Sequence, residues 1–179
     1  MRPVYMTREL SVAADADGIA LDQAIPLGNL TLNGAFVVAG VAQLGAQRQV
    51  ILTPGAGDDL TGVTFTLYGT TDQGQTQSEQ IAGTNNTVMA SVLSYSTVTR
   101  VAASAAGGAG ETVSVGTNGV GASPPIPMDL MITDFDVMVA GIIRSGAVDY
   151  TVQFTFDPIF DAYNADLKAV GEGAGTAAE

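Results

Sequence analysis

Carboxylates are the side chains in this sequence whose spacing could support chemistry. Asp15, Asp17 and Asp22 surround Gly18 and loosely match a calcium-binding loop. That loop requires a fixed ligand spacing and a closing Glu, and both are missing here. We therefore expect a solvated turn in this segment and no bound metal.

Two other carboxylate pairs have equally simple explanations. Asp134 and Asp136 are two residues apart, so a strand would place them on one face, where paired carboxylates can act as acid and base. A solvent-exposed strand face accounts for the same spacing. Asp58-Asp59 follows Pro54 to Gly57 and is typical of a hairpin tip. None of these residues is expected to be catalytic.

Several residue types that carry chemistry are absent from the sequence. There is no His and no Cys, which removes imidazole bases, Ser-His-Asp triads, thiolate ligands and disulfides. The glycine-rich segments 107–110 and 171–175 lack the Lys and Ser/Thr of a phosphate-binding loop. The sequence thus predicts a protein that is not an enzyme and that has no catalytic residue, cofactor or metal.

The charge balance narrows the class of partner. The formal net charge is −12, and six Lys and Arg residues are scattered along 179 residues, so we expect no contact with nucleic acid. No apolar stretch is long enough to cross a bilayer, and the first residues lack the apolar core of a signal peptide. Charged residues make up only 13% of the chain, about half the usual share. Such a weakly charged surface indicates that a partner covers part of it.

The sequence pattern predicts that the secondary structure consists of β-strands. Val63, Phe65 and Leu67 alternate with polar or amphipathic neighbours, and residues 148–156 show the same period of two most clearly. Turn signals separate the candidate strands at intervals of roughly 8 to 15 residues, which favours antiparallel pairing. We therefore predict an all-β fold, an antiparallel sandwich or a jelly-roll-like barrel. The other candidate strands are residues 35–41, 47–53, 75–81, 87–92, 96–104, 111–115 and, less cleanly, 130–139.

Three parts are expected along the chain. Residues 1–34 show little periodicity and predict an extended N-terminal arm, with turns at Asp17-Gly18 and Asn33-Gly34 and a short helical turn at Leu21–Ala24. Residues 35–165 form the β domain, with the Pro-rich segment 123–127 as an extended bridge inside it. Residues 166–179 form a flexible C-terminal tail. The buried core is expected to contain Phe65, Leu67, Tyr150, Val152, Phe154 and Phe156.

The order of these segments resembles small β-rich structural proteins in the virions of tailed bacteriophages. The resemblance covers about residues 10 to 160 and rests on Thr/Gly-rich β segments rather than on one diagnostic motif. The matching segments are residues 29–34 (NLTLNG), 40–42, 48–53 (RQVILT), 57–69, 75–83 (QTQSEQIAG), 96–101, 112–119 and 150–157.

The resemblance implies a place in the virion and no catalytic residues. It implies a capsid cement or decoration protein on the phage capsid surface that binds and stabilises the lattice of the major capsid protein. It also implies a homo-oligomer, most simply a trimer, because cement proteins commonly assemble at three-fold positions. The alternatives are a tail, collar or fibre component and a carbohydrate-binding β-sandwich, which would need an exposed aromatic platform.

Overall fold

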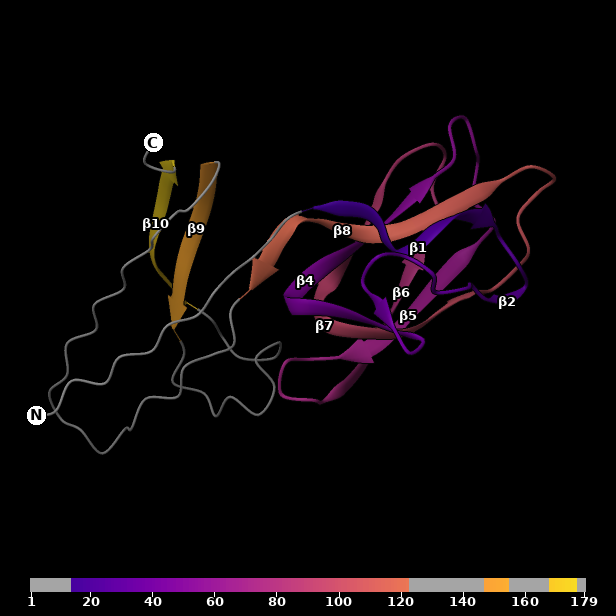
Figure 1. The fold of residues 1–179 in the computed structure, drawn as a ribbon. Coiled ribbons are helices and arrows are strands. Elements are labelled where there is room, and N and C mark those ends of the chain that lie inside the picture. Colours follow the sequence, from indigo (N-terminus) through magenta and orange to yellow (C-terminus); the bar gives the residue numbers. More distant parts are fainter. Residues whose placement is uncertain (1–13, 123–146, 155–167, 177–179) are drawn as a thin grey trace, which may run out of the picture. The chain divides into compact units, whose positions relative to one another are not determined.

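The computed structural model describes residues 14–122, 147–154 and 168–176, and for the last two ranges it describes the backbone alone. The chain divides into two compact units, Met1–Pro124 and Pro125–Glu179. The boundary falls in the Pro-rich segment that the sequence placed inside one domain. Figure 1 shows the strands of both units.

Every regular element in the described part of the first unit is a strand, and all pairings are antiparallel. The prediction of an all-β, antiparallel fold is therefore confirmed. The strands are β1 (Asp15–Ala24), β2 (Gly28–Asn29), β3 (Val37–Val38), β4 (Val41–Pro54), β5 (Thr64–Thr70), β6 (Thr76–Ala82), β7 (Met89–Ala103) and β8 (Thr112–Ala122).

These strands form one sheet in the order β1-β8-β4-β7-β5-β6, with β2 added to β7 and β3 added to β4. Only the β5–β6 pair is a simple hairpin along this path, so most neighbours are distant in sequence. The N-terminal strand β1 lies beside the last strand of the unit, β8, as the indigo and orange ribbons of Figure 1 show.

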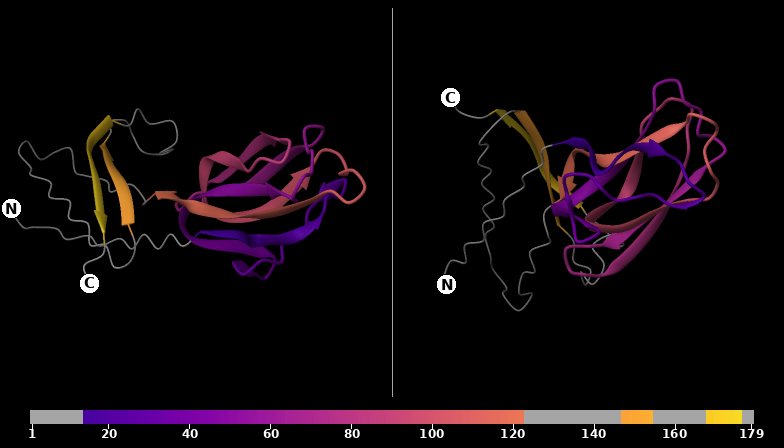
Figure 2. Two further views of the ribbon diagram at one scale, coloured as in Figure 1. Left: turned by 90° about the horizontal axis from the view of Figure 1, so that it is seen from above. Right: turned by 45° about the vertical axis from the view of Figure 1, so that its right-hand side comes forward.

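The sheet curves back on itself, and the long strand β7 makes the bend. Residues 89–98 of β7 pair with β4, whereas residues 97–103 pair with β5. Across the fold, the Gln77 side chain of β6 donates a hydrogen bond to the carbonyl of Ser94 in the first half of β7, at 2.7 Å. The two views in Figure 2 show this curvature, which gives the unit its sandwich-like form.

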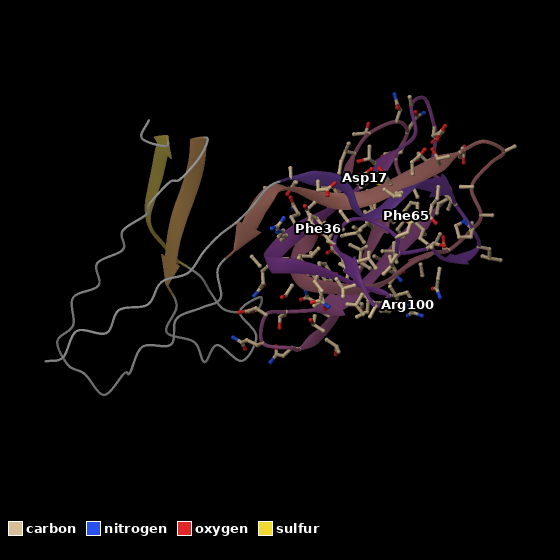
Figure 3. The ribbon with its side chains drawn as sticks, in the orientation of Figure 1. Asp17, Phe36, Phe65 and Arg100 are labelled. Carbon is tan, nitrogen blue, oxygen red and sulfur yellow. The ribbon has the colours of Figure 1, made fainter. Side chains whose placement is uncertain are left out.

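Alternating apolar residues on the inner side of the curved sheet make the core. Phe65 and Leu67 are fully buried, as predicted, while the alternating Thr64 and Thr66 are only half-buried. Figure 3 places Phe65 in the interior of this unit. The largest fully buried side chains are Tyr95, Phe65, Ile19, Leu44, Leu52, Leu60 and Leu67.

Residues 15–34 differ from the expected arm, because they contain two strands of the sheet, β1 and β2. The interval Leu21–Ala24, expected as a helical turn, lies in β1, where Gln23 and Ala24 face Val113 and Thr112 of β8. Ile19 and Ala20 are fully buried. The strand was not predicted because the Asp residues on both sides of Ile19 and Ala20 interrupt the hydrophobic alternation that is typical of a strand.

Of the two glycines expected in turns, Gly18 lies in β1, whereas Gly34 begins a turn in which the Val37 N–H donates to Gly34 O at 3.1 Å. The two glycines also lie where two segments of backbone meet. A Cβ atom on Gly34 would overlap the carbonyl carbon of Gly18. The peptide N–H of Gly34 donates to Ile19 O at 3.1 Å, and that of Phe36 donates to Gly18 O at 2.7 Å. Glycine is therefore needed at both positions for this close approach.

Two further boundaries differ because bulges interrupt the period of two. The separate strands predicted at 87–92 and 96–104 belong to one strand, β7. The dipeptide Asn118-Gly119, a common turn sequence, lies inside β8 at a register shift against β4. A bulge inserts residues without ending a strand, so its polar and glycine residues resemble a turn in the sequence.

In the second unit, β9 (Ala147–Phe154) pairs antiparallel with β10 (Lys168–Thr176). Strand β9 confirms the prediction over residues 148–154. Strand β10 differs from the expected flexible tail over residues 168–176. The side chains of Tyr150, Val152 and Phe154, all of Phe156, and the candidate strand 130–139 lie outside the described part, so these predictions are untested.

Candidate docking surface

The carboxylates that resembled a calcium loop lie along β1, where no turn gathers them. Asp15 is half-buried, and Asp17 and Asp22 are exposed. A hydrogen bond from the Asp15 side chain, followed by partial desolvation and the Asp15 charge, raises the pKa of Asp17. No group of three or more potential metal-ligating side chains occurs within the described ranges.

Asp58 has a structural role instead of forming a free hairpin tip. Its carboxylate accepts a hydrogen bond from the Thr112 N–H at 2.8 Å, which joins the β4–β5 loop to the start of β8. Its carbonyl accepts the Asn86 N–H at 2.8 Å, which adds the β6–β7 loop. Asp59 is exposed, and Asp134 and Asp136 lie outside the described residues.

The distribution of charge is the main feature of the surface. Strands β4, β5, β7 and β8, which include the centre of the sheet, contain no Asp or Glu, although the chain has 18 of them. In residues 14–122 the carboxylates are confined to β1, to loops and to Glu79 of β6. The outer faces of the central strands are therefore almost uncharged.

Two cations interrupt these central strands, and only one of them is on the surface. Arg48 of β4 is 7% exposed, and its guanidinium carbon lies 5.4 Å from the centre of the Phe36 ring. Burial lowers the pKa of Arg48. Arg100 of β7 is exposed and marks one margin of the unit in Figure 3.

Arg100 lies over the ring of Tyr68, with 3.7 Å between its guanidinium carbon and the ring centre. A bulge creates this contact. Tyr68 faces Arg100 while Gly69 faces Val98, so Thr99 is an extra residue in β7, and its hydroxyl donates to Tyr68 O at 3.2 Å. The extra residue lets Val98 and Val101 both point into the core and leaves Thr99 and Arg100 outside.

Two further bulges lie near Gln49 of β4, one in each of the neighbouring strands β7 and β8. In β7 the bulge spans Ser91–Leu93, and in β8 it spans 118–120. The Gln49 side chain joins them, because it donates to Ser91 O at 2.6 Å and accepts from the Asn118 amide at 2.5 Å. The bulges also expose Val92 (74%) and Val120 (54%).

Sequence reasoning did not single out this surface. It counted Arg100 only as one of six scattered cations. One signal was available, since the apolar residues Val98 and Val101 are three apart in an otherwise alternating segment. Such a spacing indicates a bulge when the flanking segments are strands.

Comparisons with family models, with curated proteins and with solved structures found no match for this chain. Among the residues that the structure describes, no helix is long and apolar enough to cross a membrane.

Proposed function

We propose that this protein is a non-catalytic structural component of a virus particle, a decoration or cement protein that binds and stabilises the capsid lattice. One observation supports this most: an acidic chain keeps every carboxylate out of four strands of its main sheet. Charged residues are depleted from the centres of protein interfaces, whereas a free surface usually mixes both signs. The neutral faces are therefore suited to contact with another protein.

The Arg100–Tyr68 stack is the proposed anchor on this surface. Arg and Tyr are enriched among the residues that dominate binding energy. Stacking on Tyr68 limits the conformations of the Arg100 side chain before it binds, which reduces the entropy lost on docking. An ordered, exposed guanidinium on a neutral surface is suited to a carboxylate on the partner.

The same stack argues against the carbohydrate-binding alternative. A sugar ring packs on an open aromatic face, but the guanidinium of Arg100 occupies a face of Tyr68 at 3.7 Å. The distribution of charge has no bearing on the choice between capsid surface and tail, which depends on copy number.

The first experiment measures how many copies of this chain a purified particle contains. Particles would be separated on a denaturing gel, and the ratio of this chain to the major shell subunit determined by quantitative mass spectrometry. The proposal predicts a ratio comparable to that of the shell subunit. A few copies per particle would favour a tail, collar or fibre component, and absence from particles would refute the proposal.

The second experiment tests the anchor. Arg100→Ala and Tyr68→Ala should each weaken binding to undecorated particles by about tenfold or more, because each removes half of the stack. Asp22→Ala, at an exposed position on β1, serves as the matched control and should bind normally. Unchanged binding by both stack variants would show that the docking surface lies elsewhere.

A further inference from the structure

The two end strands of the sheet differ in how their outer backbone groups are used. Strand β1 is covered by its own chain: Gly18 O and Ile19 O accept the peptide N–H groups of Phe36 and Gly34, at 2.7 and 3.1 Å. The Leu21 N–H donates to the Asn33 side chain at 2.9 Å. Strand β6, at the other end, has β5 as its only paired neighbour within the described residues.

The hydrogen bonds to β5 determine which backbone groups of β6 point outward. The Gly83 N–H donates to Val63 O at 2.8 Å, and antiparallel pairs alternate between bonded and non-bonded. Ile81, Glu79 and Gln77 are therefore the residues bonded to β5. The N–H and C=O groups of Thr76, Ser78, Gln80 and Ala82 point away from it, and no backbone pairing to them occurs in the described part of the chain.

The inward side chains of β6 are already engaged with the fold. The Glu79 carboxylate accepts the N–H groups of Val92 and Leu93, at 2.7 and 3.0 Å, and Gln77 donates to Ser94 O. Gln77 and Glu79 alternate with the even-numbered residues and share the inner face of β6 with buried Ile81. Their hydrogen bonds therefore hold the first half of β7 against that inner face. The outer edge is not used by these contacts.

Within the part of the chain that the structure describes, β6 also lacks the usual protection of a sheet edge. Proteins block edge strands with Lys, Pro, bulges or a covering segment. Strand β6 has neither Lys nor Pro, and its seven pairs with β5 show no register shift. Its one charged residue, Glu79, is turned inward and hydrogen-bonded.

We propose that β6 pairs antiparallel with β6 of a second copy of this chain, around a two-fold axis at Ser78. Copies with a net charge of −12 repel each other over most of their surface. In β6 the single carboxylate is already hydrogen-bonded, so two copies can approach along this edge with little repulsion. Strand addition supplies the missing backbone partners of both copies.

Charge excludes one register, and side-chain polarity disfavours another, because Gln80 opposite Gln80 would place Glu79 opposite the apolar side chain of Ile81. The outward groups belong to even-numbered residues, so even residues must face even residues across a two-fold axis. A register with Ser78 opposite Gln80 would place Glu79 directly opposite Glu79, which is unfavourable. With Ser78 opposite Ser78, Thr76 faces Gln80, and Glu79 faces the neutral amide side chain of Gln77.

Single cysteines test this register, because the chain contains no native Cys. Directly facing residues in a bonded antiparallel pair have Cα atoms about 5.5 Å apart, within the range of a disulfide. Ser78→Cys should therefore form a covalent dimer on mild oxidation. Gln80→Cys is the matched control two residues away. Its sulfur would face Thr76 of the other copy, so it should cross-link poorly.

A charge variant tests the contact itself. Ser78→Lys places two ammonium groups against each other and should raise the dimer dissociation constant at least about fivefold, as measured by light scattering against concentration. Ala24→Lys, with the same charge change on the covered edge, should not. Unchanged melting of Ser78→Lys would show that its fold is intact.

The proposal would be overturned by a monomer at all concentrations, by preferential cross-linking of Gln80→Cys, or by association that Ser78→Lys does not affect. A two-fold contact makes dimers, so a trimeric mass would also contradict it and would favour the assembly implied by the phage resemblance. The inference does not depend on the proposed place in a virion, because it is tested on the isolated protein.

Discussion

Strands β1 and β6 terminate the same sheet, yet their edges are organised in opposite ways. Strand β1 is irregular, with two register shifts against β8, and residues 33–36 bond to its outer groups. Strand β6 is regular, and among the described residues its backbone pairs with β5 alone. An uncovered, regular edge can accept another strand, whereas a covered and irregular one cannot.

The difference originates in local sequence. Gly18 and Gly34 allow two stretches of backbone to approach closely, which lets the chain cover β1. The segment after β6 continues beside residues 60–63, where the Gly83 N–H donates to Val63 O and Thr84 O accepts the Leu60 N–H. These bonds leave the outward groups of β6 without cover from this segment. Folding thus completes the edge at β1, whereas the edge at β6 is available for association.

The largest expected effect concerns the core beneath the open edge. Phe65→Ala should lower the free energy of unfolding by about 3 to 5 kcal/mol, because it removes a fully buried ring from β5 and leaves a cavity. Denaturant unfolding measures this cost. Val38→Ala, at an exposed position, should change stability by less than about 0.5 kcal/mol. A Phe65→Ala variant as stable as the parent would mean that this face of β5 is not the core.

A smaller effect is expected at the covered edge. Gly34→Ala forces a methyl group into the Gly18 backbone and should cost about 1 to 3 kcal/mol. It should also speed hydrogen exchange in the 33–36 segment. The control is Gly62→Ala, where a Cβ atom meets nothing within 4 Å. Equal stability of the two variants would contradict the close approach that covers β1.

At the open edge, the side-chain bonds of Glu79 can be removed without changing the outward backbone groups. Glu79→Gln should cost about 1 to 3 kcal/mol, because an amide cannot accept both the Val92 and Leu93 N–H groups as a carboxylate does. Asp22→Asn, which neutralises an exposed carboxylate of β1, is the control. If both variants unfold at the same denaturant concentration, Glu79 does not hold β6 to β7.

The smallest effect is a pH dependence at β1. Because the pKa of Asp17 is raised in the folded state, the folded chain binds that proton more tightly than the unfolded chain. The stabilising contribution is present below the ordinary pKa of 3.8 and is lost as pH rises through the folded pKa. As pH rises from acid to neutral, the melting temperature of Asp17→Asn should therefore increase relative to that of the parent. Parallel curves for the two proteins would contradict this.

The sequence was sufficient for the fold class and for strands with a clean period of two, such as β5, in which Phe65 and Leu67 are buried as predicted. It was insufficient where tertiary contacts determine structure. Strand β1 contains three Asp residues and is stabilised by partners nearly a hundred residues away in β8. Strand β10 (KAVGEGAGT) has few residues that favour strands and is defined by its pairing with β9.

The candidate surface was missed for a related reason. Its features depend on bulges at Thr99, Ser91–Leu93 and 118–120, which are positions where two strands of unequal length are matched. A single strand carries only a weak sign of such a mismatch. The absence of carboxylates from the central strands was visible in the sequence but had no meaning until those strands were placed side by side.

Amide hydrogen exchange at two protein concentrations tests the central comparison most directly. We expect the N–H groups of Ser78 and Gln80 to exchange rapidly in dilute protein and to become protected as concentration rises, because a second copy supplies their acceptors. The amides of Leu21, Gly34 and Phe36 should be protected to the same degree at both concentrations, since their acceptors belong to the same chain. If the protection of Ser78 and Gln80 does not change with concentration, β6 does not pair with β6 of a second copy.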